Sequence, residues 1–177
     1  QLIAISFSGS KKIIDLSPLA GQPLVEAELL ETGISDLSPL EGMELQSLVL
    51  GKTNVADLSP LSGMPLEVID LHETAVTDLS PLEGAPLTHL FIERTEISDL
   101  SPLKGMPLQE LYISETDVID LSPLEGMPLT QLNAVESQVV DLTPLRSMDQ
   151  LRIVTPSHPR NRKPGRPRPT VRQRVAA

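Results

Sequence analysis

Apolar residues return at fixed positions along most of the chain. In the segment 66–85, LEVIDLHETAVTDLSPLEGA, the first residues follow an L-x-x-L-x-L pattern. Ile69 and Leu71 alternate with outward-facing neighbours, which is typical of a short strand that buries one face. We therefore expect a strand here, with Val68, Asp70 and His72 pointing outward. The other apolar positions expected in the core are Leu66, Val76, Leu79 and Leu82.

A pentapeptide recurs with the same spacing as this apolar pattern. Asp-Leu-Ser-Pro-Leu begins at six aspartates and returns as Asp-Leu-Thr-Pro-Leu at a seventh, each 21 residues after the last: Asp15, Asp36, Asp57, Asp78, Asp99, Asp120 and Asp141. A fixed period of this length is typical of a solenoid, in which one short coil stacks on the next. Ser-Pro is a helix-start signal, with Ser as the cap. The Gly that follows leaves room for one short turn, which we expect to be 3₁₀. We expect each Asp to accept a local backbone N–H bond.

Two further columns follow each predicted strand. A hydroxyl residue recurs in six coils and, because it donates and accepts, is expected to tie the turn of one coil to the next: Thr32, Thr53, Thr74, Thr95, Thr116 and Ser137. The residue before it alternates in sign between most coils: Glu31, Lys52, Glu73, Arg94, Glu115 and Glu136. This alternation predicts a ladder of individually weak ion pairs.

These motifs resemble the bacterial leucine-rich repeats of the internalin type, whose repeats carry a similar D-[IL]-S-P-L segment. They are closer still to arrays built on L-S-P-L-x-G-M-P-L, which are often joined to serine/threonine kinase or other signalling domains. The resemblance covers about residues 3–153, but the coil has 21 rather than 22 residues and Thr in place of Asn. It implies an α/β solenoid, a leucine-rich-repeat arc with parallel β-strands on the concave side and short 3₁₀ turns or loops on the convex side. It also implies a protein-interaction module without catalytic activity or a cofactor.

Charge divides the chain into two parts. All 24 acidic residues and 6 basic ones precede Arg152, whereas 8 basic and no acidic residues follow from that position. We predict a solenoid over 1–154, with about seven coils, and a disordered basic tail rich in Pro and Arg over 155–177. The first coil is degenerate, since Ser6 and Ser8 stand at expected core positions. It is either a polar cap or covered by an upstream element, and we expect the chain to be preceded by such a part.

The absence of cysteine excludes disulfides and thiol chemistry. No apolar run approaches the ~20 residues needed to span a bilayer. A signal-peptide pattern is absent too, so a cytoplasmic location is favoured.

The three aromatic residues fall in one column of outward strand positions: Phe7, Glu28, Val49, Asp70, Phe91, Tyr112 and Asn133. Solvent-facing aromatics are typical interface anchors, although aromatics also simply suit strands. In the flanking columns we expect two cross-strand pairs at about 5 Å, His89 with Glu110 and His72 with Glu93. The alternative is that both histidines are merely solvated. The predicted partner-binding residues are Phe7, Val49, Asp70, His72, His89, Phe91, Glu93, Glu110 and Tyr112.

Catalytic and metal sites are not expected. His72 and His89 would lie roughly 13 Å apart along the strand direction, too far to share a zinc ion. Asp70, His72 and Ser114 would lack the strained nucleophile turn and walled pocket of a catalytic triad. The aspartate column supplies one carboxylate per coil, too few oxygens for calcium. We therefore predict no enzyme activity, no metal, no cofactor and no small-molecule substrate.

The basic tail holds a second candidate function. The segment from Lys163 to Arg168, KPGRPR, is similar to an AT-hook, whose Gly-Arg-Pro core inserts arginine into the minor groove. Pro164 stands where that motif has Arg. The candidate nucleic-acid residues are Arg162, Lys163, Gly165, Arg166 and Arg168. A plain solvated tail and an electrostatic clasp onto the acidic coils are the alternatives, and the acidic coils would repel phosphates.

The sequence as a whole predicts a monomeric interaction or scaffold module that binds a protein partner on its concave face. We expect it to be part of a larger bacterial signalling or surface protein. Nucleic-acid association through the tail is the first alternative. A purely structural spacer, whose acidic surface serves solubility, is the second.

Overall fold

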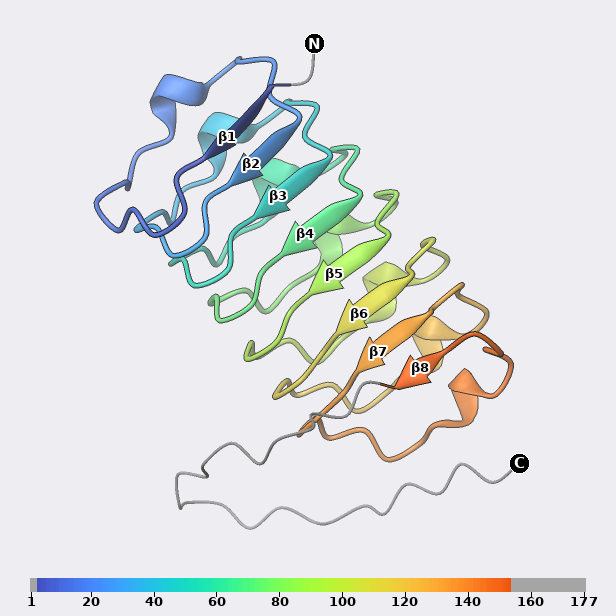
Figure 1. Ribbon diagram of the computed structural model, residues 1–177. Coiled ribbons are helices and arrows are strands. Elements are labelled where there is room, and N and C mark those ends of the chain that lie inside the picture. The colour runs from blue at the N-terminus through green and yellow to red at the C-terminus, as the bar shows by residue number, and fades with distance from the viewer. Residues whose placement is uncertain (1–2, 154–177) are drawn as a thin grey trace, which may run out of the picture.

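The computed structural model describes residues 3–153, and the candidate nucleic-acid residues 162–168 lie outside this range. Eight short parallel strands form one sheet in which each strand pairs only with its sequence neighbours (Figure 1). The strands are β1 (Ala4–Ser6), β2 (Glu26–Glu28), β3 (Ser47–Val49), β4 (Val68–Asp70), β5 (His89–Phe91), β6 (Glu110–Tyr112), β7 (Gln131–Asn133) and β8 (Arg152–Ile153). From β2 to β7 the register advances by 21 residues per strand, as predicted.

The other side of the coils carries seven single 3₁₀ turns, which also confirms the prediction (Figure 1). They are η1 (Ser17–Leu19), η2 (Ser38–Leu40), η3 (Ser59–Leu61), η4 (Ser80–Leu82), η5 (Ser101–Leu103), η6 (Ser122–Leu124) and η7 (Thr143–Leu145). Each turn holds Pro as its second residue, where a missing N–H costs no hydrogen bond.

The aspartate of the repeated motif starts each 3₁₀ turn. In every coil its carboxylate accepts the backbone N–H of the Ser or Thr two residues later at 2.8 Å, as predicted. The prediction that Ser itself caps the turn is wrong, because the hydroxyl points back to the same carboxylate. Ser59 Oγ, for example, donates to Asp57 Oδ1 at 2.6 Å. These two hydrogen bonds lower the pKa of the Asp57 carboxyl.

The space between strands and turns is a continuous aliphatic core. All six apolar residues predicted inward in the coil 66–85 are buried, none more than 1 % exposed. Packing loosens in the last coil, where Val139, Leu142 and Met148 are only partly buried. Since each coil is covered by its neighbours, the terminal coils have fewer contacts to stabilise them.

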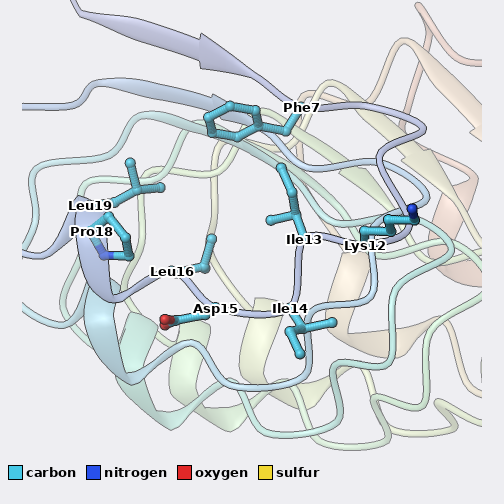
Figure 2. Close-up of a pocket in the computed structure, with 8 residues that line it drawn as sticks. All are labelled: Phe7, Lys12, Ile13, Ile14, Asp15, Leu16, Pro18 and Leu19. Atoms are coloured by element: carbon cyan, nitrogen blue, oxygen red, sulfur yellow. The ribbon is translucent and has the colours of Figure 1, made fainter.

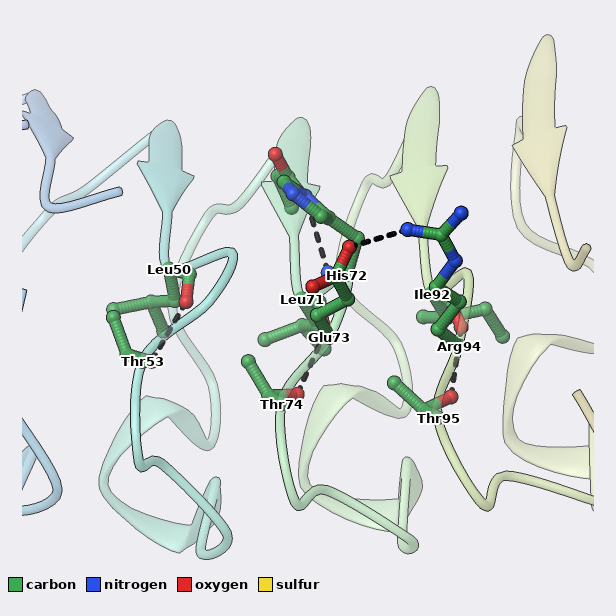
Figure 3. Close-up of polar contacts among 10 residues, drawn as sticks. Leu50, Thr53, Leu71, His72, Glu73, Thr74, Ile92, Arg94 and Thr95 are labelled. Carbon is green, nitrogen blue, oxygen red and sulfur yellow. Dashed lines mark hydrogen bonds and ion pairs between the residues drawn. The ribbon is translucent and has the colours of Figure 1, made fainter. Parts of the chain in front are cut away.

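The threonine column acts within coils rather than between them. Each Thr hydroxyl donates to the backbone carbonyl three residues earlier in its own coil, at 2.6–2.7 Å (Figure 3). The predicted tie from coil to coil is therefore wrong. The residue before each Thr has a positive φ of 54–57°, which turns the chain back toward that carbonyl: Glu31, Lys52, Glu73, Arg94, Glu115 and, before Ser137, Glu136. The threonines thus close a tight turn directly after each strand.

The first coil is one residue longer than the rest. Ile5 pairs with Ala27, whereas a strict period would place Ser6 there. The Gly9 N–H donates to the Leu30 carbonyl, just as the Glu31 N–H donates to the Gly51 carbonyl, so Gly9 and Glu31 are equivalent although 22 residues apart. The extra residue therefore lies in 10–12. Ile5 therefore packs against the core. The expectation that Ser6 occupies this core position is wrong.

Phe7 is displaced by the same shift. Ser6, not Phe7, lies opposite Glu28 in the outward column. Two residues after Ile5, Phe7 shares the inward face. It lies above Leu16 and Leu19 at the open end of the solenoid (Figure 2). The predicted place of Phe7 among the outward aromatics is wrong.

Within residues 3–153, no helix is long and apolar enough to cross a membrane.

Candidate functional site

Phe91 on β5 and Tyr112 on β6 form the centre of the outward sheet face. The two residues are register partners, and their ring centroids lie 5.0 Å apart with the planes tilted by 44°. Such a tilted arrangement is favourable for aromatic rings. Both side chains are half-buried. The Tyr112 hydroxyl donates to Gln131 Oε1 at 3.2 Å, which holds its ring toward β7.

Three carboxylates border this ring pair. Asp70 lies opposite Phe91 on the neighbouring strand β4. Glu93 follows Phe91 by two residues, and Glu110 precedes Tyr112 by two, so both share the outward face. We call these five residues, Asp70, Phe91, Glu93, Glu110 and Tyr112, the acid–aromatic patch.

His89 contacts the patch as predicted. Its Nε2 lies 3.9 Å from Glu110 Oε1 across the strands β5 and β6. The same carboxylate oxygen accepts a hydrogen bond from Gln131 Nε2 at 3.0 Å. His89 Nδ1 lies 2.8 Å from Thr88 Oγ1. The predicted cross-strand pair is present, at the long end of ion-pair distances.

His72 has a different partner from the one predicted. Its Nδ1 lies 2.6 Å from Asp70 Oδ1 in its own coil, and its backbone N–H donates to the same oxygen at 3.0 Å. Glu93 is the expected neighbour one coil away, and the charge of His72 opposes the rise of its pKa, but the direct contact of the ring is with Asp70. The ring is free to lie beside β3 because Gly51, its neighbour there, has no side chain.

The electrostatic environment of the patch is negative. Burial raises the pKa of Glu93, and the charge of Asp70 adds to the effect. Burial also raises the pKa of Tyr112, with contributions from Glu110 and Glu93. Both shifts disfavour a further negative charge at this place.

Arg94, which follows Glu93, is paired outside the patch and is the smallest of the causes acting on the Glu93 pKa. Its guanidinium pairs with Glu73 at 2.6 Å in the turns beyond the strands (Figure 3). It also pairs with Glu115 at 3.0 Å. These contacts confirm the central part of the predicted ion-pair ladder. At the N-terminal end, Glu31 pairs with Lys11 at 3.1 Å.

Comparisons with solved structures place this geometry in a known fold. An internalin C2 from Listeria monocytogenes is similar over 85 % of this chain and 79 % of its own, with 24 % identity and a TM-score of 0.65. An internalin (InlF) from the same organism is similar over 86 % of this chain and 66 % of its own, with 22 % identity and a TM-score of 0.55. The fold is a leucine-rich-repeat solenoid. No family model and no curated protein matches the sequence.

The leucine-rich-repeat solenoid brings most predicted site residues together. Val49 lies opposite Asp70 on β3 and extends the acid–aromatic patch toward the N-terminus. His72 and His89 lie at its two edges. Phe7 alone among the predicted residues is separated from the others, at the end of the solenoid.

The residues Asp70, His72 and Ser114 are not linked as a catalytic triad. Ser114 Oγ is buried without a hydrogen-bond partner in the described part of the chain, so His72 does not activate it. In residues 3–153, no group of three or more His, Cys, Asp or Glu residues is arranged to hold a metal ion.

Sequence reasoning missed an apolar pocket at the N-terminal end of the solenoid. It has a volume of about 310 Å³ and lies between Phe7, Ile13, Leu16 and Leu19 (Figure 2). Beside it, Ile14 is 68 % exposed. The adjacent apolar residues Ile13 and Ile14 were the available signal, although Val118–Ile119 and Val139–Val140 repeat it in two later coils.

Proposed function

We propose that the leucine-rich-repeat solenoid is a non-catalytic protein-interaction module that binds a partner on its concave sheet face. The observation that carries this proposal is the half-buried Phe91–Tyr112 pair at the centre of an open sheet. Aromatic residues of this kind, partly desolvated and ringed by polar groups, are typical anchors of protein interfaces.

Rigidity of the scaffold supports the same function. Phe91 and Tyr112 stand on neighbouring strands whose inward residues, Leu90 and Leu111, are fully buried. Their positions are fixed before a partner arrives, which lowers the entropy cost of binding. Val49, Asp70, His72, His89, Glu93 and Glu110 supply the surrounding contacts. The protein is proposed to act as a monomer within a larger bacterial signalling or surface protein.

A pull-down from native lysate tests this function. The baits are the intact chain, a chain ending at Val154, and the variant Phe91→Ala with Tyr112→Ala. Phe7→Ala is the matched control, because it removes an aromatic ring outside the acid–aromatic patch. We expect the partner to be lost only with the double variant.

A stability measurement accompanies the pull-down. The double variant should lose about 1 kcal/mol for the ring pair, together with the burial of two half-exposed side chains, and remain folded by circular dichroism. Partner loss only on truncation after Val154, and its sensitivity to nuclease, would instead assign the function to the basic tail. Retention by every bait would contradict the concave-face proposal.

A further inference from the structure

From β1 to β7 the sheet face carries acidic side chains and no Lys or Arg, and Arg152 on the last strand β8 is opposite Gln131. The outward positions in and directly after β1–β7 hold five carboxylates and neither Lys nor Arg: Glu26, Glu28, Asp70, Glu93 and Glu110. Three of the five surround the Phe91–Tyr112 pair. A partner that buries this face must therefore offset negative charge at its centre.

The three carboxylates lie close enough to the rings to share one ligand group. Asp70 is one strand away from Phe91, a spacing of about 4.8 Å. Glu93 and Glu110 are each two residues from a ring along a strand, about 7 Å. A flat cation lying on the rings would thus be within reach of carboxylates on more than one side.

Groups within the protein balance this charge only in part. Asp70 has His72 at 2.6 Å, and Glu110 has His89 at 3.9 Å. Glu93 forms no ion pair within the described residues. Burial and the charge of Asp70 raise its pKa, so the ionised carboxylate is disfavoured where it stands, even though His72 and Arg94 act in the opposite direction.

We propose that the acid–aromatic patch receives a cationic side chain, an arginine or lysine, presented by a peptide segment of the protein partner. A guanidinium stacks on aromatic faces and donates to carboxylates at the same time, so arginine fits best. This inference rests on the proposed function and specifies the chemistry of the partner. It also predicts that acidic or phosphate-rich ligands are rejected.

An amidated Gly-Ser-Arg repeat peptide is the probe, with a Gly-Ser-Gln repeat peptide as the uncharged control. Both are titrated into the full chain while the ring resonances of Phe91 and Tyr112 are followed by NMR. We expect the arginine peptide to shift both ring systems and the glutamine peptide to leave them unchanged.

Charge variants locate the effect. The patch variant carries Asp70→Asn, Glu93→Gln and Glu110→Gln. The matched control carries Glu41→Gln, Glu83→Gln and Glu125→Gln, which remove the same charge from exposed residues after the 3₁₀ turns. The patch variant should bind the arginine peptide roughly tenfold more weakly, as expected for three weak ion pairs. The control should change it by less than about twofold.

Three results would overturn the inference. The first is that the arginine peptide leaves the ring resonances of Phe91 and Tyr112 unmoved. The second is that both charge variants weaken binding of this peptide equally. The third is that the ring resonances shift when the chain's own cations are removed, with no peptide present. The last is tested with Arg162→Gln, Lys163→Gln, Arg166→Gln and Arg168→Gln, and it would make the basic tail the occupant. If the pull-down partner is retained by the patch variant but lost with Phe91→Ala and Tyr112→Ala, the concave-face function is supported and the cationic ligand is contradicted. If it survives both, the proposed function itself falls.

Discussion

The imidazole ring of His72 lies against the backbone of Gly51 in the adjacent coil. A Cβ atom built at residue 51 would lie 2.3 Å from the Cε1 and Nδ1 atoms of this ring. The ring occupies that place while its Nδ1 contacts Asp70 Oδ1 at 2.6 Å. The absence of a side chain at residue 51 therefore determines where one edge of the acid–aromatic patch lies.

Gly51→Ala should displace the His72 ring and break its contact with Asp70. We expect altered imidazole ¹⁵N shifts and a loss of about 1 kcal/mol of stability, the value of one hydrogen bond. In a His72→Ala background the same substitution should cost almost nothing. An equal cost in both backgrounds would show that the backbone, not the ring, opposes the methyl group.

Thr74→Val should destabilise the fold by about 1 kcal/mol, because it removes the hydroxyl that donates to the Leu71 carbonyl at 2.7 Å. Thr74→Ser should retain most of the stability. The seventh coil already uses this solution, since Ser137 Oγ donates to the Ala134 carbonyl at 2.7 Å. Urea unfolding of the three proteins provides the comparison, and equal losses for Val and Ser would attribute the effect to packing.

Lys52→Asn should stabilise the protein by about 0.5 kcal/mol. Lys52 has a φ of +57°, a conformation that Asn tolerates better than other residues with a side chain. Lys104→Asn is the control, because Lys104 is equally exposed but has a φ of −54°. Thermal unfolding should show a gain at position 52 and none at 104. A gain at both positions would show that the positive φ is not its cause.

Acid should destabilise the repeats through their aspartates. Hydrogen bonds from Ser or Thr lower the pKa of six of them: Asp15, Asp36, Asp57, Asp78, Asp120 and Asp141. A lowered folded-state pKa means stability that is present above the unfolded pKa, about 4, and is lost as pH falls through the folded value. Melting temperatures should therefore drop below about pH 4.

Asp57→Asn separates the hydrogen bond from the charge. The amide oxygen can still accept the Ser59 N–H, so the variant should fold at neutral pH and show a weaker acid dependence than the wild type. Asp57→Ala should be destabilised at every pH. If Asn and Ala behave alike, the charge rather than the turn hydrogen bond is the important contribution.

Glu93→Gln should raise stability at pH 7. Burial raises the pKa of Glu93, so its ionised form is less favourable in the folded state than in the unfolded state. The wild type gains stability as pH falls through this raised pKa, and the advantage of Gln should shrink in parallel. Melting curves at neutral and mildly acidic pH measure the difference. A constant advantage across pH would assign it to causes other than ionisation.

The repeat pattern predicts the fold well because each repeated residue forms the same local structure in every coil. The strands from β2 to β7, the Ser-Pro-Leu turns and the Asp–Ser hydrogen bonds follow directly from the 21-residue period. The 21-residue period fails only in the first coil, where residues 10–12 lack the repeated motif. There a single extra residue places Phe7 on the inward face.

Side-chain partners were harder to predict than positions. Both histidines were placed on the correct face, but the partner of His72 depended on the bare backbone of Gly51, which spacing does not reveal. The Thr hydroxyls were directed to the wrong coil because the left-handed residue before each of them is Glu, Lys or Arg, not the Gly that would have signalled the turn. The repeat therefore predicts which residues share a face, whereas predicting their contacts requires the conformation of the backbone.

Because each coil contacts only its neighbours, the acid–aromatic patch depends on a short segment of the solenoid. It lies on β4, β5 and β6 and, with Glu93, just after β5, and each of these strands pairs only with its immediate neighbours. A segment containing these coils begins and ends at equivalent points of the 21-residue period. We expect such a segment, inserted into another array with the same 21-residue period, to present the same side chains in the same arrangement.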